Sequence, residues 1–206
     1  MARISVADRR TQLVQAAMQV IAREGMAAAT TRAIVAESGM SLASFHYVFQ
    51  SRDELMKLAV HEVLRVERER ILEKLSQITE ADGHDLHKLL EAALLGYLHS
   101  VQENSAQEQA MLEFTLYSMR NESYLPMALD QYDAYYELVI FLMAQIAEAA
   151  RIEWTVPSED LARYMVSVTD GVTLLWLTSR DDEKCARAIT LAASGLAVHT
   201  RPRAAE

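Results

Sequence analysis

The amino-acid sequence predicts an all-α protein with an N-terminal three-helix domain followed by a larger helical domain. Only three prolines and six glycines occur in 206 residues, and apolar residues recur at helical rather than alternating spacing. Near the N terminus, two short helical segments joined by a glycine-containing turn follow a longer helix, which is the pattern of a helix-turn-helix unit. We therefore expect one domain over residues 1–52, a second over 53–200 and a disordered tail over 201–206.

Each of the first two predicted helices has start or stop signals in the sequence. An apolar stripe follows residues 8–24 and stops at Gly25, a residue type that favours the C-terminal end of a helix. The second helix starts at Thr30 or Thr31, because either hydroxyl can cap the first turn, and it ends before a turn at Gly39.

The third predicted helix, residues 42–49, combines two apolar anchors with outward polar groups. Phe45 and Phe49 are four residues apart, so they share one helical face and pack the segment against its support. A Ser-x-x-Glu capping box that begins at Ser51 then starts a fourth helix, which continues to about Ile78.

The rest of the chain is predicted to be helical after a loop at residues 80–83. Pro157 and Ser158 open one of these helices, with Ser158 as the expected cap, and acidic residues in the first turn of the last helix suit the helix dipole. The predicted segments are residues 84–102, 107–120, 126–150, a helix from residue 158 and a last helix from Ser179 or Asp181.

Composition and motifs limit the class of protein. The single cysteine, Cys185, excludes an internal disulfide and a multi-cysteine metal site. His84 and His87 have metal-ligand spacing but lack a third ligand, so we interpret them as the polar start of a helix and expect no metal. Long apolar runs and a signal peptide are absent from the sequence, which predicts a cytoplasmic protein. Catalytic and phosphate-loop motifs are also absent, so we expect neither an enzyme nor a cofactor.

Charge is unevenly distributed along the chain, whose formal net charge is −9. Residues 1–57 carry seven Lys or Arg and five Asp or Glu, a net charge of +2, so the remaining residues carry −11. Nucleic-acid binding depends on local charge rather than on the average pI. A mildly basic N-terminal domain on an acidic protein is therefore compatible with DNA binding.

In a helix-turn-helix unit the second short helix enters the DNA major groove, where base edges can be distinguished. The side chains that the third predicted helix turns outward include short donors and acceptors suited to phosphates and bases. A surface helix with merely solvated polar groups has the same spacing, so the pattern alone leaves both interpretations open. The outward residues are Ser41, Leu42, Ser44, His46 and Tyr47.

Residues 8–58 resemble the tetracycline-repressor (TetR) family of bacterial transcription regulators. The resemblance rests on the amphipathic helix that ends at Gly25, on TTRAIVAESGMS at residues 30–41 and on FHYVFQSRDEL at residues 45–55. It implies a homodimer that places two helix-turn-helix domains on a palindromic double-stranded DNA operator, and repression as the commoner outcome. A helical adaptor or co-regulator without specific DNA binding is the alternative.

The resemblance also implies roles for individual residues. Thr31 would contact a phosphate at a helix N-terminus, and Arg32 would bind a guanine edge or a phosphate. Leu42 and Ala43 offer only apolar contacts, and Arg52 stands where the family usually has a phosphate-binding Lys. Three positions of the third helix depart from the residues frequent in the family, so the operator sequence is not predicted. The expected DNA-binding residues are Thr31, Arg32, Ser41, Leu42, Ala43, Ser44, His46, Tyr47 and Arg52.

Two heptad-like apolar stripes near the C terminus resemble a pairing interface. The family resemblance implies that the last two helices dimerise as a four-helix bundle, which makes these stripes the expected dimer interface. The same stripes are also compatible with burial inside one chain. They consist of Leu161, Met165, Val168, Val172, Leu175, Cys185, Ile189, Ala192 and Leu196.

The resemblance further implies that a small-molecule effector binds in the second domain and weakens DNA binding by moving the fourth helix. Aromatic, Met and a few polar residues suit the wall of such a pocket, although they are equally typical of a helical core. The effector's identity is not predicted. The candidates are Tyr97, His99, Met111, Phe114, Tyr117, Arg120, Asn121, Tyr136, Asp170 and Trp176, with Tyr124 and Tyr132 among further aromatic wall residues.

Overall fold

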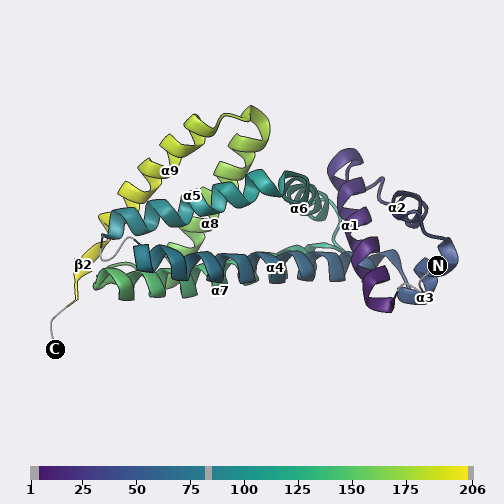
Figure 1. The fold of residues 1–206 in the computed structure, drawn as a ribbon, viewed down its shortest axis with the longest axis horizontal. Helices are drawn as coiled ribbons and strands as arrows, with labels where there is room; N and C mark the ends of the chain where they lie inside the picture. Colours follow the sequence, from purple (N-terminus) through teal and green to yellow (C-terminus); the bar gives the residue numbers. More distant parts are fainter. Residues whose placement is uncertain (1–4, 82–84, 204–206) are drawn as a thin grey trace. The chain divides into compact units, whose positions relative to one another are not determined.

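The computed structural model describes residues 5–81 and 85–203. These residues are mostly helical, with two short strands (Figure 1), which confirms the all-α prediction. The elements are α1 (Val6–Glu24), α2 (Thr31–Ser38), α3 (Leu42–Val48), α4 (Arg52–Ala81), α5 (Leu86–Glu103), α6 (Ser105–Ser118), α7 (Leu125–Ala150), β1 (Ile152–Trp154), α8 (Ser158–Ser179), α9 (Asp182–Ala197) and β2 (Thr200–Pro202).

Several helix ends lie where the sequence signals predict them. The Thr30 hydroxyl caps α2 by accepting the Ala33 amide at 3.2 Å. The Asp181 carboxylate caps α9 by accepting the Lys184 amide at 3.0 Å. Gly25 ends α1 with a φ of +83°, a conformation that residues with a Cβ rarely adopt.

Several predicted boundaries differ from the structure by a few residues, among them the start of α8 and the loop after α4. Ser158 was expected to cap α8, but it is the first residue of that helix, and Pro157 at the cap position has no side-chain acceptor. Residues 80 and 81 of the expected loop at 80–83 belong to α4 instead. The remainder of that loop and His84 lie outside the described residues.

The chain divides into two compact units. Among the described residues, unit 1 consists of 5–65 and 104–131, and unit 2 consists of 66–81, 85–103 and 132–203. The predicted boundary after residue 52 falls inside unit 1, because the middle of the chain returns to pack with the N-terminal helices.

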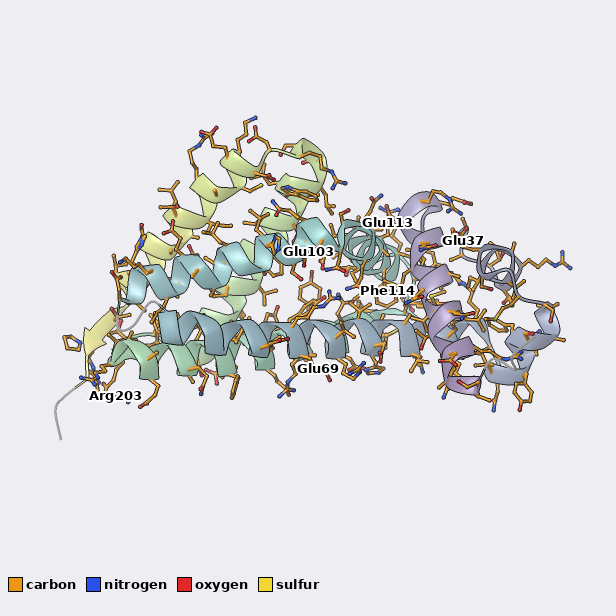
Figure 2. The ribbon with its side chains drawn as sticks, in the orientation of Figure 1. Glu37, Glu69, Glu103, Glu113, Phe114 and Arg203 are labelled. Carbon is orange, nitrogen blue, oxygen red and sulfur yellow. The ribbon has the colours of Figure 1, made fainter. Side chains whose placement is uncertain are left out.

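Unit 1 is built around α1, which packs against α2, α3 and α6 (Figure 1). Helix α6 therefore packs on α1, and Phe114, labelled in Figure 2, joins the core of the N-terminal helices from α6. Glu37 on α2, also labelled in Figure 2, pairs with Arg23 on α1 at 2.8 Å. The largest fully buried side chains of this core are Leu13, Ile21, Met26, Ile34, Phe45, Phe49, Leu55 and Met56.

Unit 2 buries the two apolar stripes that were expected to form a dimer interface. Helix α9 packs on α5 and α8, and the stripes are the inner faces of α8 and α9. Side chains buried in this way pack within one chain, which is the alternative that the sequence left open, and a contact of this set with a partner stays a prediction. Leu161, Met165, Val172, Cys185, Ile189, Ala192 and Leu196 are buried, and Val168 and Leu175 are partly buried.

The C-terminal residues pair with the segment between α7 and α8. Strands β1 and β2 are antiparallel, with Glu153 opposite Arg201, and these two side chains form an ion pair at 2.7 Å. The Arg203 amide adds a hydrogen bond to the Arg151 carbonyl at 3.0 Å. The predicted disordered tail is therefore wrong for residues 201–203, while 204–206 lie outside the described residues.

Candidate nucleic-acid interface

The turn between α2 and α3 is held by backbone hydrogen bonds that require a left-handed residue. Gly39 has a φ of +67°, its amide donates to the Ala36 carbonyl at 3.3 Å, and the Met40 amide donates to the Val35 carbonyl at 3.0 Å. These two bonds form a Schellman motif, which ends α2 and redirects the chain within two residues. The glycine thus sets the angle at which α3 leaves the turn.

Helix α3 has too few residues to be stable by itself, so caps and anchors hold it. The Ser41 hydroxyl accepts the Ser44 amide at 3.1 Å, and the Ser44 hydroxyl accepts an N–H from Arg9 of α1 at 3.3 Å. Phe45 and Phe49 are fully buried with ring centroids 5.6 Å apart, which confirms their predicted role as anchors.

The opposite side of α3 is exposed. Tyr47 is 67% exposed and Leu42 is 44% exposed, and Ala43 and His46 are also exposed. On α2, Arg32 is exposed and Thr31 is half-buried in the first turn. No Asp or Glu lies within α3, so its outward face carries no carboxylate that would repel a phosphate backbone.

Arg52 is held differently from the expected phosphate contact. Its guanidinium donates to the Met26 carbonyl at 2.6 Å, to the Ala29 carbonyl at 2.7 Å and to the Tyr124 hydroxyl at 3.2 Å. An arginine whose donors already bind these oxygens fixes the α1–α2 loop to the start of α4 and has little capacity left for a phosphate. We therefore leave Arg52 out of the candidate interface.

Tyr124, in the turn just before α7 (Leu125–Ala150), is the partner that sequence reasoning did not assign to this part of the molecule. Its buried hydroxyl donates to the Asp53 carboxylate and accepts from Arg52, and its ring packs edge-on against Tyr117 and Phe114. The hydroxyl therefore ties the α6–α7 segment to the first turn of α4. The adjacent charged residues Arg52 and Asp53 were visible in the sequence, but their partner Tyr124 lies some 70 residues away, so the sequence did not indicate the contact.

Replacing Tyr124 by Phe is expected to lower stability by about 1–3 kcal/mol at neutral pH, because Arg52 and Asp53 lose a buried partner. Burial, and next the bond to the Asp53 carboxylate, raise the pKa of Tyr124 to about 12. The folded chain thus holds this proton more tightly than the unfolded chain. The associated stability is present below the ordinary pKa of about 10 and is lost as the pH rises through the folded-state pKa.

Urea unfolding at about pH 9 and about pH 11 measures this effect. The wild type is expected to lose more stability over that interval than the Tyr124→Phe variant. Tyr47→Phe, at an exposed hydroxyl, controls for the loss of a phenol. An identical pH dependence in wild type and Tyr124→Phe would contradict the assignment.

The ten effector candidates are divided equally between the two units, so they do not form one site within either unit. In unit 1, Met111 and Phe114 are buried in the core and Tyr117 packs against it. Arg120 is exposed, and the Asn121 amide donates to the Tyr117 carbonyl at 2.7 Å. Met111 and Phe114 serve as packing residues here.

In unit 2, three of the five candidates lie in two sets of contacts, whose α8 members Asp170 and Thr173 are three residues apart. Tyr97 bonds to Thr173, Asp170 bonds to Tyr132, and Tyr136 packs against Tyr132. Thr173 had not been predicted from the sequence. The other two candidates lie in different contacts: exposed His99 pairs with Glu103 at 3.2 Å, and the Trp176 indole donates to Asp182 at 2.7 Å.

A helix-turn-helix unit whose second helix is buried on one side and exposed on the other, in a chain that also contains a second helical unit, is typical of DNA-binding transcription regulators. Residues 13–59 match the family model "Bacterial regulatory proteins, tetR family", and residues 87–200 match "BetI-type transcriptional repressor, C-terminal". The chain belongs to the TetR family of bacterial regulatory proteins.

Characterised relatives agree with this assignment. The chain is 26% identical over 182 residues to the HTH-type nicotine-responsive transcriptional repressor HdnoR of Paenarthrobacter nicotinovorans, covering 88% of this chain and 90% of HdnoR. It is 34% identical over 113 residues to the HTH-type transcriptional regulator BetI of Vibrio campbellii, covering 55% of each. These relatives are transcription regulators, and this chain is a ligand-responsive DNA-binding regulator of the same family.

Solved structures share the fold. Salmonella enterica GusR superposes with a TM-score of 0.71 at 21% identity, covering 92% of this chain and 94% of GusR. A TetR transcription regulator from Haloarcula marismortui superposes with a TM-score of 0.70 at 21% identity, covering 95% of this chain and all of the other.

Within residues 5–81 and 85–203, no helix is long and apolar enough to cross a membrane.

Proposed function

We propose that the protein is a homodimeric repressor that binds a palindromic operator and is released by a small organic molecule. The observation that carries this proposal is the outward face of α3, where exposed Leu42, Ala43, His46 and Tyr47 lie opposite two buried phenylalanines. A helix held by its inner face and free on its outer face is suited to enter a major groove. Arg32, exposed on α2, supplies a charged group beside it.

A dimer is supported by the outer faces of α8 and α9. Leu174 is 57% exposed, Leu191 is 74% exposed and Val198 is 75% exposed, and Tyr164 is exposed on the same helix as Leu174. Tyr164, Gly171 and Leu174 on α8, and Leu191 and Gly195 on α9 with Val198 just after its end, recur at spacings of three, four or seven residues. We call these six residues the outer α8–α9 face, and we propose that it contacts the partner subunit.

The effector proposal rests on the family and on one relative. HdnoR is named as nicotine-responsive, and we propose that this chain likewise responds to a small organic molecule. To release DNA, such a molecule must bind the DNA-incompetent conformation more tightly than the competent one, typically by about 1–3 kcal/mol.

Fluorescence anisotropy tests the DNA-binding proposal directly. Labelled duplexes from the DNA upstream of the protein's own gene and a scrambled duplex of equal length are titrated with the full-length protein over a salt series. We expect roughly a thousandfold preference for one upstream duplex and a steep decrease in affinity with salt. Equal, weak binding to all duplexes would count against self-regulation; a genome-wide selection of bound fragments that also returned no site would favour the adaptor alternative.

Arg32→Ala and Tyr47→Ala are each expected to weaken operator binding by about 1–3 kcal/mol. If Arg32 binds a phosphate, its loss also lowers the slope of log affinity against log salt by about one, because one counterion fewer is released. If it binds a base, the variant instead discriminates less between bases at one operator position. Arg201→Ala, on β2 of unit 2, is the matched control and should bind DNA as the wild type does. Unchanged affinity in both test variants would place the DNA-binding face elsewhere.

A further inference from the structure

Unit 2 contains a polar cluster formed by residues of α5, α7 and α8. We define the tyrosine–aspartate cluster as Tyr97, Tyr132, Tyr136, Asp170 and Thr173. The Tyr97 and Thr173 hydroxyls are 2.6 Å apart, the Tyr132 hydroxyl donates to Asp170 at 2.9 Å, and the Tyr132 and Tyr136 ring centroids are 6.2 Å apart. Asp170 and Thr173 are three residues apart on α8, so both side chains lie on one face of that helix.

Asp170 is a half-buried carboxylate, and the part of the chain that the structure describes contains no ion pair with it. Burial raises the pKa of its carboxyl group, and the hydrogen bond from Tyr132 only partly opposes this effect. A charge in such surroundings is unfavourable unless a partner compensates it. One neutral hydroxyl is weak compensation for a carboxylate.

The helices that carry the cluster are poor in basic residues. Helix α7 contains four acidic residues and no Lys or Arg. The basic residues of α5 and α8 are Lys88 and Arg163, and each lies at an exposed position beside an acid, with Lys88 3.9 Å from Asp85 and Arg163 3.0 Å from Asp160. The Lys, Arg, Asp and Glu residues of these three helices therefore disfavour an anion and favour a cation.

We propose that the tyrosine–aspartate cluster binds the charged group of an organic monocation, a protonated amine or a quaternary ammonium. Asp170 supplies the counter-charge, and the Tyr132 and Tyr136 rings supply apolar and cation–π contacts. Thr173 lies three residues after Asp170 on α8, and its hydroxyl pair with Tyr97 adds an acceptor for an ammonium N–H or a ligand hydroxyl. This inference rests on the proposed effector response and names the chemical class of the effector.

Calorimetric titration of the full-length protein tests this assignment with matched probes. The probes are phenethylammonium and benzyltrimethylammonium as cations, 2-phenylethanol as the neutral analogue and 3-phenylpropionate as the anion. At least one cation is expected to bind about tenfold or more tightly than 2-phenylethanol, because the phenyl group is shared and the charge differs. The proposal is overturned if the anion or the alcohol binds more tightly than both cations.

Asp170→Asn retains the shape of the side chain and removes its charge. We expect it to weaken cation binding about tenfold or more and to leave 2-phenylethanol binding unchanged. Asp160→Asn, an exposed acid on the same helix, removes the same charge and should retain wild-type cation affinity. Tyr132→Phe keeps the ring and should retain the preference for cations.

Two outcomes separate this inference from the proposed function. If Asp170→Asn folds with a wild-type melting curve and binds the cations as tightly as the wild type does, Asp170 has only a structural role and the inference fails. If the protein binds its operator specifically in the anisotropy assay but shows no preference for cations, DNA regulation stands and the effector class is wrong. If Asp170→Asn does not fold, the inference is tested by the affinities of the wild-type protein for the four probes, which need no variant.

Discussion

Replacing Leu191 by Arg is expected to convert the homodimer into a folded monomer and to lower operator affinity by about two orders of magnitude. Leu191 lies on the outer α8–α9 face and is 74% exposed in the single chain, so the new guanidinium is solvated in the monomer. In the dimer, the same group would be buried against an apolar partner surface without a counter-charge. A monomer contacts only one half-site, so it loses the gain in affinity that a dimer obtains when its two helix-turn-helix domains bind the same DNA together.

Sedimentation velocity, thermal unfolding and DNA anisotropy measure the three parts of this prediction. Leu116→Arg, at an exposed leucine on α6, is the matched control and should remain dimeric. A Leu191→Arg variant that stays dimeric at micromolar concentration would show that the partner binds elsewhere.

Arginine at Ile189, two residues earlier on α9, should act in a different way. Ile189 is fully buried in the unit 2 core, so the charge would have to enter an apolar interior, which costs several kcal/mol. We expect this variant to lose its cooperative thermal transition instead of becoming a folded monomer. A folded Ile189→Arg monomer would contradict the assignment of the two faces of α9.

Replacing Phe45 by Ala is expected to destabilise unit 1 by about 3–5 kcal/mol. Phe45 is fully buried and packs against Phe49, and it is the buried residue of α3. Because a helix this short depends on such packing, specific DNA binding should be lost along with the stability. Chemical denaturation followed by circular dichroism measures the loss, and anisotropy measures the effect on the operator.

Phe141→Ala is the matched control for this prediction. Phe141 is an exposed phenylalanine on α7, so its truncation leaves little cavity and should cost well under half as much. A Phe45→Ala variant with wild-type stability and operator affinity would show that α3 is held mainly by its caps.

The helix-turn-helix unit was predictable from local sequence because its signals are local. Gly39 ends α2, and the spacing of Phe45 and Phe49 sets the buried face of α3, while Ser41, which was predicted only as a DNA contact, also caps α3. Each of these features acts within a few residues of itself, through backbone conformation, a hydrogen bond of fixed geometry or the helical repeat. The exposed residues of α3 then follow from the buried ones.

The contacts of Arg52 and the burial of the α8 and α9 stripes were not predictable in this way. Arg52 binds carbonyl groups of Met26 and Ala29 and the hydroxyl of Tyr124, and the sequence contains no local signal for so distant a partner. A heptad-like stripe such as that containing Val172 and Ile189 is equally compatible with a core and with an interface, because both bury the same apolar side chains.

The sequence by itself determined the all-α fold class, the caps and turn of the helix-turn-helix unit and the side of α3 that faces outward, because these depend on interactions between near neighbours. Only the tertiary structure decided which faces of α8 and α9 are buried and that Tyr124 contacts the start of α4. It also brought Tyr97, Tyr132 and Asp170 from three helices into one cluster. The physical reason is that periodicity identifies an apolar or polar face, whereas the partner of that face is selected by long-range packing of the whole chain.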